Sequence, residues 1–457
     1  MKDTADPGLL NNPLPQRWRR TTLGDIGEYI NGRGFKKSEW SDKGLPIVRI
    51  QNLTGSSSEQ NYYEGDIEER HIVEPGDLLI SWAATLGAYI WPGPRAAVNQ
   101  HIFKVRSFID KKLHYYLTRH ILDDLYRQAH GSGMVHITKS KFDATPVLIP
   151  EMGELQKQVV AEIEKQFSRL DKAVVNLKRI KVNLKRYKAA VLKAAVEGRL
   201  VETEALIAKR EGRSYETGEQ LLARITEARR HQWKVRGRYK EPAAPNVTQL
   251  SEVPDAWTVS SLSALLDEPL RNGHSAKATS DPNGLRAFTL SAVTKGDFSE
   301  ANTKLTVAQP EKVATLWAQP GDIYIERSNT PELVGTARLY RGPANFAFIP
   351  DLLIRIRLCN QVLPEFVEIA LSSNFGRNYF RAHAQGISGT MPKIDQSIIE
   401  SFAVLLPPIE EQRRIVAETE RRLSIVNEIE NQIDTNLKRA KHMRQAVLAR
   451  MFDGQAQ

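Results

Sequence analysis

Two long stretches of the chain carry apolar residues at the spacing of one narrow helical seam. Between Glu154 and Glu197 neither glycine nor proline occurs over 44 residues. Residues 409–453 are equally free of both. The apolar positions recur at steps of three, four or seven residues, with one step of ten, at Val160, Ile163, Phe167, Leu170, Val174, Leu177, Leu184 and Val191, and again at Val416, Leu423, Val426, Ile433, Leu437 and Val447. This spacing is typical of long helices that pair along a seam, each about 65 Å long here.

The segment before each long helix has a different pattern. It is rich in glycine, proline and β-branched or aromatic residues, and its apolar runs are short, as in residues 78–82 and 101–105. Such runs predict short strands separated by turns. Residues 111–127 and 363–381 have helical spacing, so each segment is predicted to be mixed α/β. The pattern leaves the order of the strands open.

The chain contains an internal repeat. Trp18 matches Trp257, Gly76 matches Gly321, Met134 matches Met391, and Val191 matches Val447, each within a similar local sequence. The offsets are 239, 245, 257 and 256 residues, so the order is kept while insertions lie inside the unit. Four ordered matches indicate two copies of one unit of roughly 200 residues.

These patterns predict an α+β fold in which two mixed α/β domains alternate with two long helices. The predicted domains are residues 1–150 and 251–408, and the helices are residues 151–200 and 409–457. Residues 201–250 are charged and are predicted to be a linker with a solvated helix over 219–233. Matching length and placement favour an antiparallel coiled coil with the two domains at opposite ends. The alternative is two unrelated amphipathic helices, each packed on its own domain.

Charge and composition narrow the classes of partner. Lys and Arg exceed Asp and Glu by 64 − 54 = +10, and the pI is about 9.4, which favours an anionic partner such as nucleic acid or a membrane surface. One cysteine, Cys359, excludes an internal disulfide framework, and a buried thiol is the expected state. No apolar run approaches the roughly 18 residues of a membrane span, and the N-terminus lacks the apolar stretch of a signal peptide. We expect a soluble, cytoplasmic protein.

Motifs of catalysis are missing from the sequence. There is no Asn-Pro-Pro-aromatic run for amino-methylation, no nucleotide-cradling Gly-x4-Gly-Lys-Ser/Thr loop, and no Glu-x-Lys of metal-dependent nucleases. The ten histidines show no His-x3-His or His-Glu-x2-His spacing. We therefore predict no catalytic residue, no metal site and no cofactor in this chain.

The ordered motifs resemble a known family. Pro-Ile-Val-Arg-Ile-Gln-Asn-Leu at 46–53 precedes Pro-Gly-Asp-Leu-Leu-Ile-Ser-Trp at 75–82 and Val-Asn-Gln-His-Ile-Phe at 98–103. In the second copy, Leu-Leu-Pro-Pro-Ile-Glu-Glu-Gln-Arg at 405–413 leads into the long helix. With the duplication, this looks like the specificity subunit of type I restriction–modification systems. Residues 150–156 and 285–291 depart from the motifs of the other copy.

The resemblance implies a fold and a function. The two domains would be target-recognition domains that each read half of a split, asymmetric site in double-stranded DNA. The paired helices would be a spacer that carries two methyltransferase subunits, joined by restriction subunits with a motor activity. S-adenosylmethionine, ATP and Mg²⁺ would then belong to those partners. A stand-alone DNA-binding regulator and a structural coiled-coil scaffold remain as alternatives.

Base edges are commonly read by Arg or Lys at guanine and by Asn or Gln at adenine, and scattered cations hold phosphates. The candidates in the first domain are Lys36, Lys37, Arg49, Gln51, Asn52, Asn99, Gln100, His101 and Lys139. Those in the second domain are Arg271, Asn272, Arg286, Arg327, Ser328, Asn329 and Lys393. Arg49 and Asn52 have a second interpretation as scaffold residues, because a motif shared among proteins with different targets is a poor place for specificity. Trp82 is expected in the core.

The first long helix carries a basic stripe. Eight Lys or Arg and no acidic residue lie between Lys172 and Lys193. The stripe either follows DNA between the half-sites or is an ordinary solvated face. Our hypothesis is that exchanging Lys181, Lys185 and Lys188 for Glu lowers affinity and its salt dependence while leaving sequence preference intact. For partner docking, the neighbourhoods of Gln156 and of Glu411 and Gln412 are the candidates.

Overall fold

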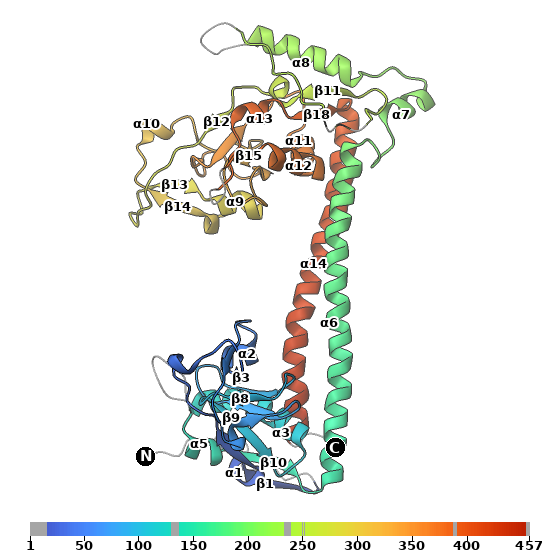
Figure 1. Ribbon diagram of the computed structural model, residues 1–457. Coiled ribbons are helices and arrows are strands. Elements are labelled where there is room, and N and C mark those ends of the chain that lie inside the picture. Colours follow the sequence, from blue (N-terminus) through green and yellow to red (C-terminus); the bar gives the residue numbers. More distant parts are fainter. Residues whose placement is uncertain are drawn as a thin grey trace. The chain divides into compact units, whose positions relative to one another are not determined.

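The computed structural model describes residues 16–128, 137–232, 239–248, 250, 252–386 and 391–453. The chain divides into two compact units, Met1–Arg179 with Ile433–Gln457, and Ile180–Gln432. Both units are α+β, and their elements are labelled in Figure 1.

The first unit is built on two four-stranded sheets and a two-stranded ribbon. One sheet has the antiparallel order β2-β9-β6-β7, the other has the order β4-β3-β8-β5 with β3 parallel to β8, and β1 pairs with β10. Its strands are β1 Trp18–Thr22, β2 Gly27–Asn31, β3 Leu45–Val48, β4 Asn61–Tyr63, β5 Ile72–Val73, β6 Leu78–Ser81, β7 Gly87–Ile90, β8 Ala96–Val98, β9 Ile102–Ser107 and β10 Pro146–Pro150. Its short helices are α1 Leu23–Ile26, α2 Ile50–Thr54, α3 Lys111–His120, α4 Leu122–Gln128 and α5 Lys139–Asp143.

The second unit repeats this topology in part, with a two-stranded sheet in place of the second four-stranded one. Its four-stranded sheet has the order β12-β17-β15-β16, β11 pairs with β18, and β13 pairs with β14. The strands are β11 Thr258–Ser261, β12 Arg271–Asn272, β13 Leu285–Phe288, β14 Thr303–Thr306, β15 Ile323–Glu326, β16 Ala337–Leu339, β17 Leu353–Ile356 and β18 Ala403–Leu406. The helices are α7 Glu204–Glu211, α8 Gly218–Gln232, α9 Leu290–Lys295, α10 Pro310–Val313, α11 Pro364–Ser372, α12 Asn374–His383 and α13 Gln396–Glu400.

The two predicted long helices are confirmed as α6, Gly153–Val196, and α14, Ile409–Phe452, each of 44 residues. Helix α6 ends before Gly198, which adopts φ +66. That left-handed conformation is easily reached only by glycine and is a common helix stop. The predicted helical stretches 111–127 and 363–381 are each two helices, because the chain breaks at Ile121 and at Ser373. The Ser373 hydroxyl caps α12 by accepting from the Gly376 N–H at 3.2 Å.

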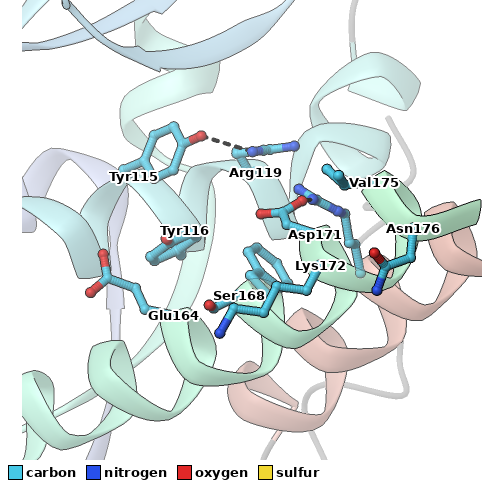
Figure 2. A pocket seen from close by; sticks show the side chains of 11 residues that line it. Tyr115, Tyr116, Arg119, Glu164, Ser168, Asp171, Lys172, Val175 and Asn176 are labelled. Atoms are coloured by element: carbon cyan, nitrogen blue, oxygen red, sulfur yellow. Dashed lines mark hydrogen bonds and ion pairs between the residues drawn. The ribbon is translucent and has the colours of Figure 1, made fainter. Parts of the chain in front are cut away.

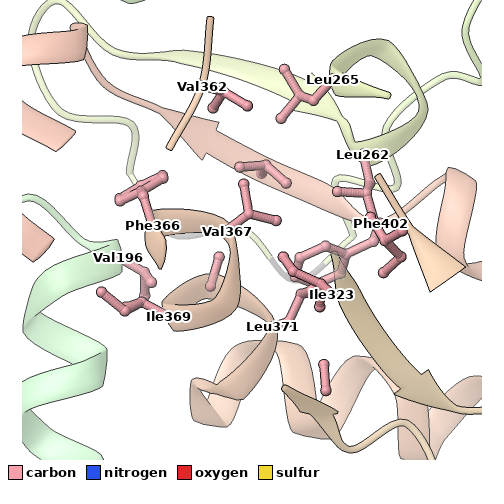
Figure 3. Packing of buried hydrophobic residues seen from close by; sticks show 14 of the residues in the cluster. Val196, Leu262, Leu265, Ile323, Val362, Phe366, Val367, Ile369, Leu371 and Phe402 are labelled. Atoms are coloured by element: carbon pink, nitrogen blue, oxygen red, sulfur yellow. The ribbon is translucent and has the colours of Figure 1, made fainter. Parts of the chain in front are cut away.

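The seam residues of both helices lie on buried or half-buried faces. In the first unit Ile163 and Phe167 of α6 share a core with Leu448 and Phe452, at the end of α14. In the second unit the end of α6 enters the core of the second copy, where Figure 3 shows Val196 beside α11. Burial of an apolar side chain of this size contributes about 1.5–3 kcal/mol. Each domain core therefore contains the last turns of the other copy's helix.

The linker prediction was wrong in one respect. Helix α8 is not merely solvated, because Leu221 and Ile225 are buried in the same cluster as Trp257. Most residues of the helix are polar or charged, so its few apolar residues did not stand out in the sequence. For this reason a solvated helix was predicted. The segment that joins the two copies is thus partly an element of the second unit.

A buried glutamine in the first turn of each long helix connects it to its own domain. The Gln412 Oε1 atom accepts from the Leu363 N–H at 3.1 Å, and its Nε2 donates to the Pro407 carbonyl at 3.0 Å. Gln156 repeats both bonds with the Asp110 N–H at 2.9 Å and the Pro150 carbonyl at 3.0 Å. One side-chain amide therefore pairs with a backbone carbonyl after a strand and with a backbone N–H before a helix, both of which would otherwise lack a hydrogen-bond partner.

Replacing Gln412 with Ala should destabilise the second unit by about 2–4 kcal/mol, because a half-buried donor and a buried acceptor lose their partner. Chemical denaturation followed by circular dichroism measures the effect. Gln445→Ala, at an exposed position of α14, is the matched control and should leave the transition unchanged. Equal transitions for the two variants would contradict this role of Gln412.

Candidate nucleic-acid interface

Trp82, the first residue after β6, is held by two backbone hydrogen bonds. Its N–H donates to the His101 carbonyl at 3.2 Å, and its own carbonyl accepts from the Ile137 N–H at 3.2 Å. The Trp82 ring is half-buried, stacks on Phe103 at 5.8 Å between centroids and meets His101 edge-on at 5.4 Å. Trp82 therefore packs against the core, as predicted, but lies next to candidate residue His101.

Arg327, the first residue after β15, occupies the same backbone frame in the second copy. Its N–H donates to the Leu352 carbonyl at 2.8 Å, and its carbonyl accepts from the Ile394 N–H at 2.9 Å. We call the two positions, 82 and 327, the reading positions. The frame is shared although a tryptophan stands in one copy and an arginine in the other.

A glycine shapes the neighbouring loop in each copy. A Cβ atom on Gly32 would lie 2.3 Å from the Asn99 carbonyl oxygen, and one on Gly273 would lie 2.2 Å from the Pro350 carbonyl oxygen. No larger residue fits without moving the backbone. Sequence reasoning missed both, since a lone glycine in a polar loop carries no specific signal.

The first-copy candidates gather where two parallel strands end. Arg49 follows β3 and Asn99 follows β8, and the Asn99 N–H donates to the Val48 carbonyl at 3.0 Å. Gln100 and His101 continue from Asn99, and the two side chains approach to 3.3 Å. The structure thus brings three candidates together with the reading position Trp82.

Arg49 and Asn52 have internal partners. The Asn52 side chain accepts from the Arg49 N–H at 3.0 Å and donates to the Glu59 carbonyl at 2.9 Å. The Arg49 guanidinium donates to Asn61 Oδ1 at 2.7 Å and lies 4.8 Å from the centre of the Trp40 ring. Both residues stabilise the turn around α2, which matches the scaffold interpretation.

The other candidates of the first copy lie at the surface. Lys36 and Lys37 are exposed at the short turn after β2, and Gln51 is half-buried on α2. Lys139 begins α5 and forms an ion pair with Asp143 at 2.6 Å.

In the second copy, several candidates surround one hollow of about 810 Å³. Its lining residues are Arg327, Ser328, Leu352, Gln385, Gly386, Met391, Lys393, Ile394 and Asp395. Asn272 lies close by, since its Oδ1 accepts from Gln396 Nε2 at 3.2 Å. Arg271, exposed on β12, lies 3.9 Å from Glu268.

Two candidates of the second copy have other partners. Arg286 donates to Glu300 at 2.7 Å and to Thr303 at 2.8 Å. Asn329 donates to Glu326 Oε2 at 2.7 Å. Glu326 is fully buried, and burial raises the pKa of its carboxyl above the usual range although Thr294 and Asn329 donate to it. These bonds brace the loop that begins with Arg327.

The comparisons with known proteins agree on one family. Residues 15–185 match the model of the type I restriction modification DNA specificity domain. The EcoKI specificity subunit of Escherichia coli K12 is 24% identical over 97% of this chain and 90% of its own length. The EcoBI specificity subunit of Escherichia coli is 25% identical over 98% and 88%. Residues 15–185 thus carry a type I restriction–modification DNA specificity domain, and the chain as a whole is similar to specificity subunits of this kind.

Solved structures of this family have a similar fold. The HsdS subunit from Thermoanaerobacter tengcongensis superposes with a TM-score of 0.53 and 17% identity, covering 97% of this chain and 98% of its own. A chain from a study of the assembly and conformational transition of the type I R-M system gives a TM-score of 0.62 with 17% identity over 96% and 98%. This likeness shows that the fold is shared.

The basic stripe of α6 is exposed with one exception. Lys188 is half-buried, and its ammonium lies 2.7 Å from Glu430 and 2.8 Å from the Asn427 Oδ1 atom on α14. Lys188 is therefore a poor choice for a DNA-contact test, because a substitution would also break contacts between the helices. Lys181 and Lys185 are exposed on α6.

The suggested docking residues are not available to a partner. Glu411 is fully buried and accepts from the Trp257 indole and the Glu204 N–H, each at 2.9 Å, while burial raises its carboxyl pKa. Gln412 and Gln156 are buried as well. These three side chains make the junction between helix and domain, and docking at the surface around them stays a prediction.

A more accessible feature in the first unit is a hollow of about 670 Å³ between α3, α6 and the end of α14. Figure 2 shows Tyr115, Tyr116 and Arg119 of α3 facing Glu164, Ser168, Asp171 and Lys172 of α6. Arg444 of α14 forms an ion pair with Asp171 and lies 5.1 Å from the Phe167 ring. At 64% exposure, Val175 is an apolar residue at its rim.

The described part of the chain offers little for catalysis. It contains no group of three or more His, Cys, Asp or Glu residues that could hold a metal ion. Cys359 is half-buried, and burial raises the pKa of its thiol, which disfavours the nucleophilic thiolate. Among the described helices none is long and apolar enough to cross a membrane.

Proposed function

We propose that this chain is the DNA-reading subunit of a type I restriction–modification complex and binds a split, asymmetric site in double-stranded DNA. Each copy reads one half-site. The observation that carries the proposal is the pair of reading positions: one backbone frame presents Trp82 in one copy and Arg327 in the other. A duplicated frame with different side chains is what two different half-sites require.

The proposal assigns the chemistry to partner subunits. Two methyltransferase subunits would supply the S-adenosylmethionine site, and restriction subunits would supply the ATP and Mg²⁺ sites. The chain itself would position them on DNA without catalysing a step. A cytoplasmic location follows from the same proposal, since its substrate is the cell's DNA.

We further propose that α6 and α14 pair as an antiparallel coiled coil. Asp171 of α6 forms an ion pair with Arg444 of α14, and Lys188 of α6 forms one with Glu430 of α14. From the first pair to the second, the residue number increases along α6 and decreases along α14, as it does in antiparallel helices. Lys188 also donates to the Asn427 Oδ1 atom. Asp171 and Asn427 are 256 residues apart in the sequence, as are Lys188 and Arg444. The Asp171–Arg444 and Lys188–Asn427 contacts therefore join equivalent positions of the two copies.

The first test is the map of N6-methyladenine in the host genome with the gene present and deleted. Deletion should abolish methylation at one split, asymmetric motif, and the motif gives both half-sites. A stand-alone regulator or a structural scaffold would leave the map unchanged while the partner methyltransferase is expressed.

The basic stripe yields a second prediction. The double variant Lys178→Glu with Lys185→Glu should bind the mapped duplex more weakly, because each substituted lysine no longer neutralises a phosphate. The slope of log affinity against log salt should fall by about 1 for each such phosphate. Sequence preference should persist. Fluorescence anisotropy of the complex with its methyltransferase subunits at several salt concentrations measures both quantities.

Lys438→Glu with Lys441→Glu makes the same change of net charge at exposed positions of α14 and should keep the original slope. An equal reduction of the salt slope in both double variants would show that the effect comes from net charge. It would contradict a contact between the basic stripe and DNA.

We propose that the methyltransferase subunit docks at the hollow between α3, α6 and α14. Aromatic rings and charges of both signs line this hollow next to the exposed Val175, and tight interfaces favour aromatic and arginine anchors. Val175→Glu should lower the yield of co-purified methyltransferase about tenfold or more, because a charge would be buried at the rim.

Val182→Glu is the control, at a position of α6 that is 53% exposed and does not line the hollow. Pull-down with the tagged specificity subunit measures the amount of co-purified methyltransferase relative to the specificity subunit. Equal yields for both variants would place docking elsewhere.

A further inference from the structure

Arg327 differs from the other arginines of its domain. Nine arginines lie between residues 252 and 408, all within the described ranges. Eight of them form an ion pair or hydrogen bond there, namely Arg271, Arg286, Arg338, Arg341, Arg355, Arg357, Arg377 and Arg381. Arg327, a half-buried residue that lines the hollow, has no such partner among the described residues. The five donors of its guanidinium therefore remain available, and their geometry fits a bidentate acceptor.

The backbone under this side chain is fixed on both sides. Besides its bonds to Leu352 and Ile394, Arg327 follows Glu326, whose buried carboxylate accepts from Thr294 at 2.6 Å and from Asn329 at 2.7 Å. Ser328 forms a β-bridge with Lys393 across the hollow's wall. Such anchoring reduces the entropy that a binding side chain loses.

The hollow around Arg327 presents donors. Arg327, Lys393 and the Gln385 amide line it, and its acidic residue, Asp395, is engaged as the N-cap of α13. The Asp395 carboxylate accepts from Ser397 Oγ at 2.6 Å and from the Ile398 N–H at 3.0 Å. The ligand that fits must bring acceptor atoms.

Two acceptor groups of DNA fit, a phosphate and the O6 and N7 edge of guanine. The reading positions decide between them. Both half-sites have phosphates, so a phosphate-binding position should carry a cation in both copies. The first copy instead has Trp82, which carries no positive charge, so the position varies as one that reads bases should.

We propose that Arg327 reads a guanine in the half-site of the second copy, through bidentate hydrogen bonds to its O6 and N7 atoms. This inference rests on the proposed function. It adds to that function which base is recognised and which residue recognises it. The Arg327 reading position is then the specificity determinant of that half-site, and Lys393 lies beside it at the hollow's rim.

The test is the methylation map of cells that carry Arg327→Ala. One guanine of the half-site read by the second copy should become degenerate, and the other half-site should stay unchanged. In vitro, the wild-type complex should bind the cognate duplex roughly 5- to 150-fold more tightly than a duplex with that G·C pair replaced, and the variant should lose this ratio. Arg341→Ala, which removes an arginine already paired with Glu368, should keep the full motif.

Thermal unfolding of the purified complex tests whether the Arg327→Ala variant is folded, and Arg327→Lys serves as a second variant that keeps the charge. Uniformly weaker binding to all duplexes, with a smaller salt slope and an unchanged motif, would show a phosphate contact and overturn the assignment. An unchanged motif with unchanged affinity would overturn it as well. A wild-type map without any split motif would instead reject the proposed function, and the guanine assignment with it.

Discussion

A buried amide at the start of each long helix is the constraint on which this structure depends. Gln156 and Gln412 each accept from the N–H of a residue at the start of a domain helix and donate to the proline carbonyl that ends the last strand. A helix 44 residues long magnifies any error in direction at its first turn. One bond of each glutamine is buried and the other is half-buried. Together the two bonds orient the first turn, and water cannot replace the buried one without exposing the core.

The same construction separates stability from specificity. Backbone hydrogen bonds hold the reading positions 82 and 327, so the backbone there does not depend on which side chain it carries. The frame accepts Trp82 packed on Phe103 in one copy and Arg327 over an open hollow in the other. Glycines at 32 and 273 make the close backbone approach that both frames need. A domain built this way can change its target by exchanging a few side chains while its sheets remain the same.

Sequence reasoning succeeded where the signal is periodic and failed where it depends on packing. The long helices were predicted from the spacing of apolar residues, and the repeat was predicted from matching motifs in the same order. Both patterns can be seen in the sequence without knowledge of tertiary contacts. The connector helix α8 was misjudged because Leu221 and Ile225 are two apolar residues among many charges, and only the neighbouring core shows that they are buried. The motif at Glu411 and Gln412 suggested a docking surface, although its polar side chains are buried to join helix and domain.

By itself the sequence determined the duplicated α+β organisation, the length of the helices, the basic charge and the family resemblance, because each depends on spacing, composition or the order of short motifs. The tertiary structure decided which of many polar residues are available. Arg286, Arg49, Asn52 and Lys188 have internal partners, whereas Arg327 lines a hollow whose acidic residue is engaged elsewhere. A side chain's partners come from strands and helices distant in sequence, so no local pattern can distinguish a paired arginine from one poised to bind.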